Sequence, residues 1–141
     1  MKRIFAFLLV LALALTGCQW NRDPKAAVFR LVETNYDKIL TACQSGDTAA
    51  LSAIKGVTSV HVEDGYVVVF CRGAGIAPST RDYGFYYTAD NIPATVDCNQ
   101  RIMQVADQLQ REGSGWQCVI QENVFYTEQI RGNLYFYSNV Y

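Results

Sequence analysis

Asp64-Gly65 lies between two runs of β-forming residues, and this feature constrains the fold more than any other in the chain. An Asp-Gly pair in a two-residue loop supplies the positive φ angles that a type I′ turn requires. The runs at 58–63 and 66–72 should therefore form an antiparallel hairpin with Val62 opposite Val67. This register gathers one set of side chains on a face that we expect to pack against the core, namely Val60, Val62, Val67, Val69 and Cys71.

The segment before this hairpin has the pattern of two helices. Asp23-Pro24 is typical of a helix start, because aspartate caps free N–H groups and proline fits the first helical position. Apolar residues then recur at helical spacing as far as Cys43, and Gly46 can end the helix. Asp47 can cap a second, short helix that closes at Gly56.

The segments after the hairpin predict further strands. Residues 73–83 are rich in glycine and serine, which indicates a loop. Alternating and aromatic-rich runs then predict strands at 83–88, 116–121, 124–130 and 134–141. Residues 97–111 fit a helical face with Asp97 as its cap, which favours a helix, and a strand running into a hairpin at 113–115 is the alternative.

Helices followed by strands with short connections predict the α+β class. We expect an N-terminal helix, together with the short second helix, to pack on a twisted and mainly antiparallel sheet of about five or six strands. The length of 141 residues is typical of one domain, for which we predict the bounds 24–141.

The first 18 residues differ from the rest of the chain. Lys2 and Arg3 precede an unbroken apolar run at 4–15, which is shorter than the roughly 20 residues that a membrane-spanning helix needs. The run ends in Leu15-Thr16-Gly17-Cys18, which resembles the bacterial lipobox. This resemblance implies that residues 1–17 are a lipoprotein signal peptide and that Cys18 carries a diacylglycerol group. Two acyl chains anchor a protein stably where one does not.

Lipidation at Cys18 would hold the domain on the extracytoplasmic face of the cell membrane. The lipidated tether at 18–23 is short, since five extended residues reach about 17 Å. Without Lys2 and Arg3, the 12 basic residues fall to 10 against 13 acidic residues, which gives a net charge of about −3. The chain lacks the basic stripe that is typical of nucleic-acid binding, so no nucleic-acid partner is expected.

Four cysteines remain when one is lipidated: Cys43, Cys71, Cys98 and Cys118. An even number in an exported chain predicts disulfides, and four cysteines allow three pairings. Cys43 on the apolar helix face and Cys71 on the core face of the hairpin both point into one core, which favours Cys43–Cys71 with Cys98–Cys118. The chain has no Cys-x-x-Cys pair and a single histidine, so we expect neither a metal nor a cofactor.

His61 is the only candidate for imidazole chemistry. Glu63 shares its face of the hairpin, but no motif marks a nucleophile that such a pair would activate. We therefore predict that the protein is not an enzyme. A small envelope enzyme that uses His61 with a carboxylate is the alternative.

Aromatic residues crowd the second half of the chain. Alternation along strands divides them between two faces, so one face should show tyrosines to something other than the core. A tyrosine has a flat apolar body and a polar tip, which suits glycan, peptide and protein partners. We expect a binding or interaction module, with an accessory subunit of a membrane complex as the alternative. The predicted contact face consists of Tyr66, Phe70, Tyr86, Tyr135 and Tyr137.

One stretch in the middle of the chain is Phe70-Cys71-Arg72-Gly73-Ala74-Gly75-Ile76-Ala77-Pro78, with Tyr83-Gly84-Phe85-Tyr86-Tyr87 after it. This stretch resembles part of a group of short, uncharacterised exported proteins of Gram-positive gut bacteria. The resemblance implies a Gram-positive source. It assigns no functional residue, because the group has no known activity.

Overall fold

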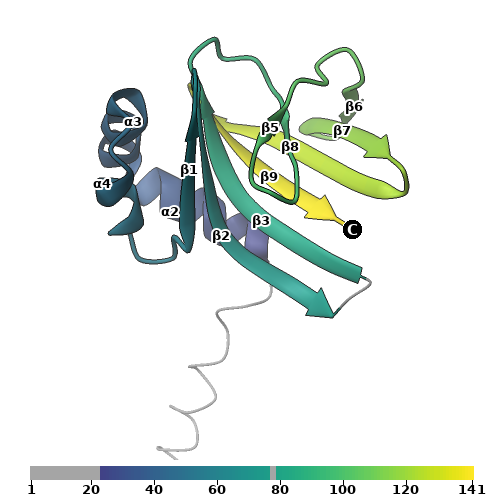
Figure 1. Cartoon of the computed structure of the whole chain (residues 1–141), viewed down its shortest axis with the longest axis horizontal. Helices are drawn as coiled ribbons and strands as arrows, with labels where there is room; N and C mark the ends of the chain where they lie inside the picture. The colour runs from purple at the N-terminus through teal and green to yellow at the C-terminus, as the bar shows by residue number, and fades with distance from the viewer. Residues whose placement is uncertain (1–22, 77–78) are drawn as a thin grey trace, which may run out of the picture.

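The computed structural model describes residues 23–76 and 79–141 (Figure 1). Cys18 and the predicted signal peptide therefore lie outside the described residues. In the described part, three helices come first: α2 (Pro24–Thr34), α3 (Tyr36–Ser45) and α4 (Thr48–Ser52). Nine strands follow, namely β1 (Ser59–Glu63), β2 (Tyr66–Ile76), β3 (Ser79–Thr88), β4 (Thr95–Val96), β5 (Ile102–Met103), β6 (Gln110–Glu112), β7 (Gly115–Ile120), β8 (Asn123–Arg131) and β9 (Leu134–Val140).

Seven of these strands form one sheet in the order β1-β2-β3-β9-β8-β7-β6, and every neighbouring pair is antiparallel. β4 and β5 form a separate two-stranded sheet. The α+β class and the antiparallel pairing are confirmed. The expected strand number of five or six is wrong, because β6 adds a seventh strand from a segment in which a helix was favoured.

The helical layer begins at Pro24, where Asp23 Oδ1 accepts a hydrogen bond from the Ala26 N–H at 3.1 Å. The expectation of one N-terminal helix is wrong, because the first helix of the described residues ends at Thr34, with Asn35 as its C-cap, and a second helix follows it. The Asn35 side-chain amide donates to the Leu31 carbonyl oxygen at 2.8 Å. The backbone there has φ −115° and ψ 20°, so α2 and α3 are two helices.

The end of α3 and the short helix follow the predicted pattern. Gly46 adopts the left-handed conformation with φ 67° and ends α3. The Asp47 side chain then accepts a hydrogen bond from the Ala50 N–H at 2.9 Å and caps α4.

The β1–β2 hairpin has the predicted register, with Val62 opposite Val67 and with Gly65 at φ 77° in the turn. Val67 and Val69 are buried in the core as expected, whereas Val62 is 42% exposed. Val68 on the other face is buried too. β2 therefore packs on both of its faces rather than on one.

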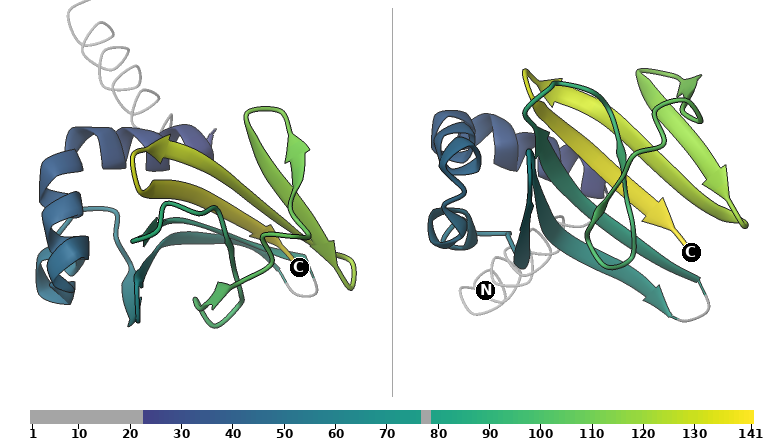
Figure 2. Two further views of the ribbon diagram at one scale, coloured as in Figure 1. Left: turned by 90° about the horizontal axis from the view of Figure 1, so that it is seen from above. Right: turned by 45° about the horizontal axis from the view of Figure 1, so that its top comes forward.

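Both faces of the large sheet are covered (Figure 2). α2 crosses one face over β3, β8 and β9, and the three helices enclose the larger hydrophobic core with that face. The segment that carries β4 lies against β8 and β9 on the opposite face and encloses a second core around Tyr86. This second layer decides which aromatic side chains can meet a partner.

Residues 97–111 contain strands and turns in place of the favoured helix. Asp97 caps a turn instead, since its Oδ1 accepts hydrogen bonds from the N–H groups of Asn99 and Arg101, both at 2.8 Å. β6 then runs into a hairpin at Gly113-Ser114, as the alternative interpretation of this segment predicted.

Residues 73–83 extend the β2–β3 hairpin, so the predicted loop is wrong for most of its length. Gly73 lies opposite Asp82, and Gly75 lies opposite Thr80. The glycine-rich composition serves close approach of the two strands, because a Cβ atom on Gly75 would lie 2.3 Å from the Ser79 carbonyl oxygen.

Candidate functional site

Three residues of the predicted contact face are buried. Tyr86, Tyr135 and Tyr137 are 0%, 2% and 1% exposed. They pack with Ala94 and Val96 of the covering segment in the second core. This burial contradicts the predicted contact face at the three positions, because alternation along a strand gives the face of a side chain and not what covers that face.

The hydroxyl group of Tyr86 holds the covering segment against the sheet. It donates to the Ala94 carbonyl oxygen at 3.0 Å, accepts from the Ala94 N–H at 2.9 Å and lies 2.6 Å from Thr127 Oγ1. Burial raises the pKa of Tyr86, although the hydrogen bonds to Ala94 and Thr127 act in the opposite direction. The role of Tyr86 is therefore structural.

The other two residues of the predicted contact face, Tyr66 and Phe70, are half-buried on β2, on either side of the buried Val68. The Gln104 side-chain amide donates to Tyr66 Oη at 3.5 Å. The five predicted contact residues thus do not form one exposed surface.

All four cysteines in the described part of the chain are free thiols, so neither predicted disulfide is present. Cys43 and Cys71 do reach the same hydrophobic core, as expected, but a shared core does not by itself bring two sulfur atoms to bonding distance. Burial raises the pKa of both thiols to about 12. Cys98 is exposed, and Cys118 is buried on β7.

His61 and Glu63 meet on β1, with 3.2 Å between His61 Nε2 and Glu63 Oε1. Both side chains are half-buried. Across residues 23–76 and 79–141, no group of three or more His, Cys, Asp or Glu side chains could hold a metal ion. The absence of a catalytic role for His61 stays a prediction.

A polar cluster that sequence patterns did not reveal joins the start of α2 to β8. Lys25 pairs with Glu128, and Tyr126 Oη donates to the same carboxylate at 2.6 Å. Burial disfavours the ionised form of Glu128, but hydrogen bonds from Lys25, Tyr126 and Ser114 outweigh it, and the pKa of Glu128 is lowered. Ser114 lies in the β6–β7 turn, so this cluster brings the start of α2 beside that hairpin.

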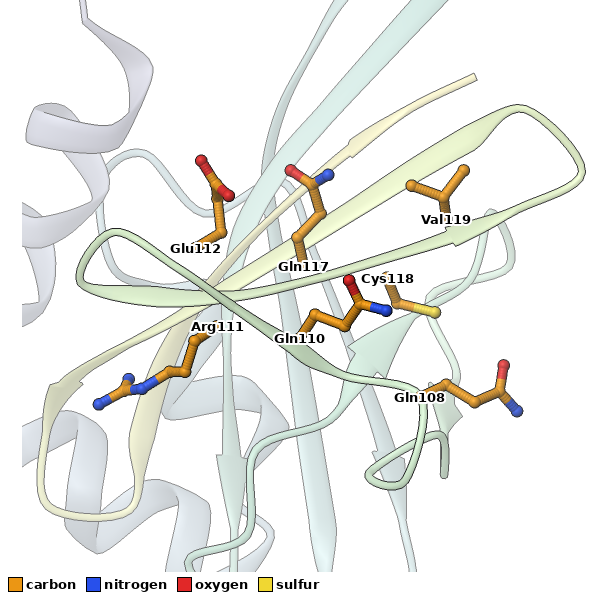
Figure 3. Close-up of a pocket in the computed structure, with 7 residues that line it drawn as sticks. All are labelled: Gln108, Gln110, Arg111, Glu112, Gln117, Cys118 and Val119. Atoms are coloured by element: carbon orange, nitrogen blue, oxygen red, sulfur yellow. The ribbon is translucent and has the colours of Figure 1, made fainter.

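The β6–β7 hairpin carries a pocket of about 400 Å³ at the edge of the large sheet (Figure 3). Glu112, Gln117 and Val119 project to one side of the hairpin, whereas Arg111 points the other way. The Arg111 guanidinium carbon lies 4.6 Å from the centre of the Trp116 ring. The lining is mainly polar and consists of Gln108, Gln110, Arg111, Glu112, Gln117, Cys118 and Val119.

β7 extends beyond its partner at this edge. Gln110 opposite Gln117 is the last pair of the β6–β7 ladder, and residues 118–120 of β7 have no β6 residue opposite them. Val119 in this overhang is 59% exposed. The interpretation of residues 97–111 as a strand that enters a hairpin is the signal that could have located this pocket.

The N-terminal segment is similar to known lipoproteins. Residues 1–19 match the family model described as the prokaryotic membrane lipoprotein lipid attachment site. No curated protein and no solved structure matches the chain, so no relative supports the resemblance to exported proteins of Gram-positive gut bacteria. Among the helices described, none is long and apolar enough to cross a membrane. The chain is thus a bacterial lipoprotein that is anchored to a membrane through its lipid attachment site.

Proposed function

We propose that this lipoprotein is a membrane-anchored interaction module without enzymatic activity, and that the β6–β7 pocket is its contact site. One observation carries the proposal: the strand edge that β7 leaves open at Val119 lines the same pocket as the side chains of Gln110 and Gln117. Peptide is the ligand class that such a site suits best, because an extended peptide can use both the edge and the amides.

Three of the seven residues that line the pocket are glutamines. Each primary amide offers two N–H donors and a carbonyl acceptor, which complement the C=O and N–H groups of a peptide. Arg111 and Glu112 add one charge of each sign, so the lining does not favour a polyanion. An uncharged amide neither takes up nor releases a proton near neutral pH, which supports binding rather than acid–base catalysis.

An accessory subunit of a membrane complex is the second candidate function. The short tether favours it, since the five residues from Cys18 to Asp23 reach at most about 17 Å. The enzyme alternative gains no support from this pocket, because His61 and Glu63 lie on β1, at the opposite edge of the sheet from β6.

Binding arrays test the proposal. The mature lipidated protein, held in lipid nanodiscs, is exposed to peptides tiled across the extracytoplasmic segments of the source bacterium's proteins and to a glycan array. We expect peptide binding that the double variant Gln110→Ala/Gln117→Ala loses. The matched control Gln44→Ala, at an exposed glutamine on α3, should keep it. Binding to glycans alone, binding that survives the double variant, or no binding at all would contradict the proposal.

A further inference from the structure

We infer that the ligand of the β6–β7 pocket is an extended peptide segment that adds as a strand to the open edge of β7, and that this segment belongs to a protein held in the same membrane. The inference rests on the proposed function of the pocket and specifies its partner. Strand addition uses backbone hydrogen bonds for affinity and side-chain pockets for specificity.

The pairing of β6 with β7 shows which backbone groups of β7 face outward. Glu112 and Gly115 flank a two-residue turn and therefore form a hydrogen-bonded pair. Hydrogen-bonded and non-hydrogen-bonded pairs alternate in an antiparallel ladder, so Gln110 and Gln117 form the next hydrogen-bonded pair. Val119 lies two residues beyond Gln117 and therefore directs its N–H and C=O groups to the same side of β7, where β6 has no residue opposite it.

The turn at the other end of β7 gives the same result independently. Ile120 and Asn123 flank the turn formed by Gln121 and Glu122, whose φ angles of 49° and 73° are typical of type I′. Ile120 therefore hydrogen-bonds to β8, and its neighbour Val119 faces away from β8. Among the described loop and turn residues, none makes a backbone hydrogen bond to Val119.

The pocket lies where β6 would continue if that strand were longer. The chain leaves this line before β6 begins, since the Leu109 N–H donates to the Val105 carbonyl oxygen at 3.1 Å in a turn. Gln108 and Gln110 line the pocket on that side. An extended segment in this line would contact the backbone of Val119 together with the side-chain amides of Gln108 and Gln110.

The contacts of α2 place the turn of the β6–β7 hairpin beside the start of the helix that follows the tether. The tether joins α2 at Asp23, and the ion pair of Lys25 with Glu128 holds the start of that helix against β8. Ser114 in the β6–β7 turn is a hydrogen-bonding partner of the same Glu128 carboxylate. The open edge at Val119 lies four residues along β7 from this turn, which is about 13 Å at 3.3 Å per residue. With a tether of at most about 17 Å, an extended segment that adjoins the bilayer can reach that edge.

The open edge is also short, because only residues 118–120 of β7 extend past β6. So few backbone hydrogen bonds give a low affinity between two proteins in solution. Confinement of both proteins to one membrane raises their effective concentration and compensates for this weakness. A membrane-held partner therefore fits the site better than a freely diffusing one.

Two variants of Val119 test strand addition with the peptides that the array identifies. Val119→Pro removes the outward N–H, whereas Val119→Thr keeps it together with a β-branched side chain. The Val119 N–H faces away from β8, so the proline removes no bond of the sheet itself. For the mature lipoprotein in nanodiscs, we expect Val119→Pro to weaken peptide binding at least about tenfold and Val119→Thr to change it less than about twofold.

A second measurement does not depend on how the proline variant folds. The same peptides are synthesised with single N-methyl groups along the backbone and tested against the wild-type protein. Val119 is the one residue of the overhang whose N–H and C=O groups face outward, so one peptide residue pairs with it. We therefore expect N-methylation of that residue to abolish binding and N-methylation of its two neighbours, whose N–H groups point away from β7, to be tolerated.

The outcomes separate this inference from the proposed function. Loss of binding with Gln110→Ala/Gln117→Ala but full binding with Val119→Pro, together with no peptide position at which N-methylation abolishes binding, would overturn strand addition and leave the pocket as the contact site. Peptides drawn from segments remote from any membrane span would overturn the shared membrane. A wild-type dimer in detergent that Val119→Pro dissociates would assign the edge to a second copy of the chain. Peptide binding that is weakened neither by Gln110→Ala/Gln117→Ala nor by Val119→Pro would overturn the proposed function as well.

Discussion

Lys25 in α2 forms an ion pair with Glu128 in β8, although the two residues are 103 positions apart in the chain. The pair holds the helix that continues from the membrane tether against the sheet, next to the β6–β7 hairpin. The start of the helix that follows the tether and the turn of the β6–β7 hairpin thus meet at one corner of the domain. The Glu128 carboxylate is the centre of this corner, because Tyr126 and Ser114 hydrogen-bond to it as well.

The stability that Glu128 contributes should depend on pH. Burial opposes its ionisation, but its hydrogen bonds outweigh burial, so its pKa is lower in the folded protein than in the unfolded chain. As the pH falls, the unfolded chain takes up the proton first. The contribution is therefore complete above the unfolded pKa of about 4.3 and is lost as the pH falls through the folded pKa.

Denaturant unfolding of wild type and Glu128→Gln from about pH 7 to about pH 3 measures this effect. The difference in free energy of unfolding between the two proteins should shrink toward the acid end. The control Glu33→Gln, at an exposed position on α2, should show a small difference throughout. A Glu128→Gln difference that stays constant over this range would contradict the assignment.

Tyr86→Phe and Tyr137→Phe should have different effects, although both tyrosines are fully buried in the second core. Tyr86→Phe leaves the backbone groups of Ala94 without their partner, which should cost about 1–3 kcal/mol of unfolding free energy. Tyr137 Oη has no hydrogen-bond partner within the described structure, so Tyr137→Phe should be neutral or stabilising. Urea denaturation compares them, and equal destabilisation would contradict the hydrogen bonding described for Tyr86.

Gly84→Ala should destabilise the sheet strongly. A Cβ atom at Gly84 would lie 2.1 Å from the Val69 carbonyl oxygen and 2.7 Å from Tyr137 Cε1. We expect a loss of about 2 kcal/mol or more. Gly73→Ala on the neighbouring strand is the matched control, because its nearest atom would be Asp82 Oδ1 at 3.3 Å on a side chain that can move. Thermal unfolding of both variants checks the prediction, and a Gly84→Ala protein as stable as the control would refute it.

Thiol reactivity should follow burial. A pKa of about 12 leaves almost no thiolate on Cys43 or Cys71 near neutral pH, whereas Cys98 is exposed to reagent. Brief labelling of the folded protein with a thiol reagent, followed by peptide mass mapping, should therefore find Cys98 modified first. Reductant should leave the melting temperature unchanged. Preferential labelling of Cys43, or a mass before reduction that is lower by two hydrogens, would contradict the free-thiol assignment.

Features set by local chemistry could be predicted from the sequence. The start of α2 at Pro24 and the register around Asp64-Gly65 depend on residues within a few positions of each other, so a short pattern determines them. The strands β7, β8 and β9 could be predicted for the same reason, because two short turns separate three runs of alternating residues. The free-thiol state of Cys43 and Cys71 could not be predicted in this way, since it depends on how α3 and β2 meet.

Features set by packing between distant segments could not be predicted. Helical spacing passes through Asn35 without interruption, so nothing in the pattern marked the break between α2 and α3. The burial of Tyr135 and Tyr137 depends on a covering segment that has little regular structure of its own. The pocket depends on a difference in length between β6 and β7, which only their pairing defines.

Site-specific photo-crosslinking in intact cells tests the central claim, that the β6–β7 edge of the anchored protein is its contact site. The photoreactive residue is placed at position 119 in the full lipoprotein and, as a control, at position 38, an exposed site on α3. We expect a crosslinked membrane protein from position 119 that is absent from position 38 and is lost when Gln110→Ala/Gln117→Ala is added. Equal crosslinking from both positions, or none from position 119, would contradict it.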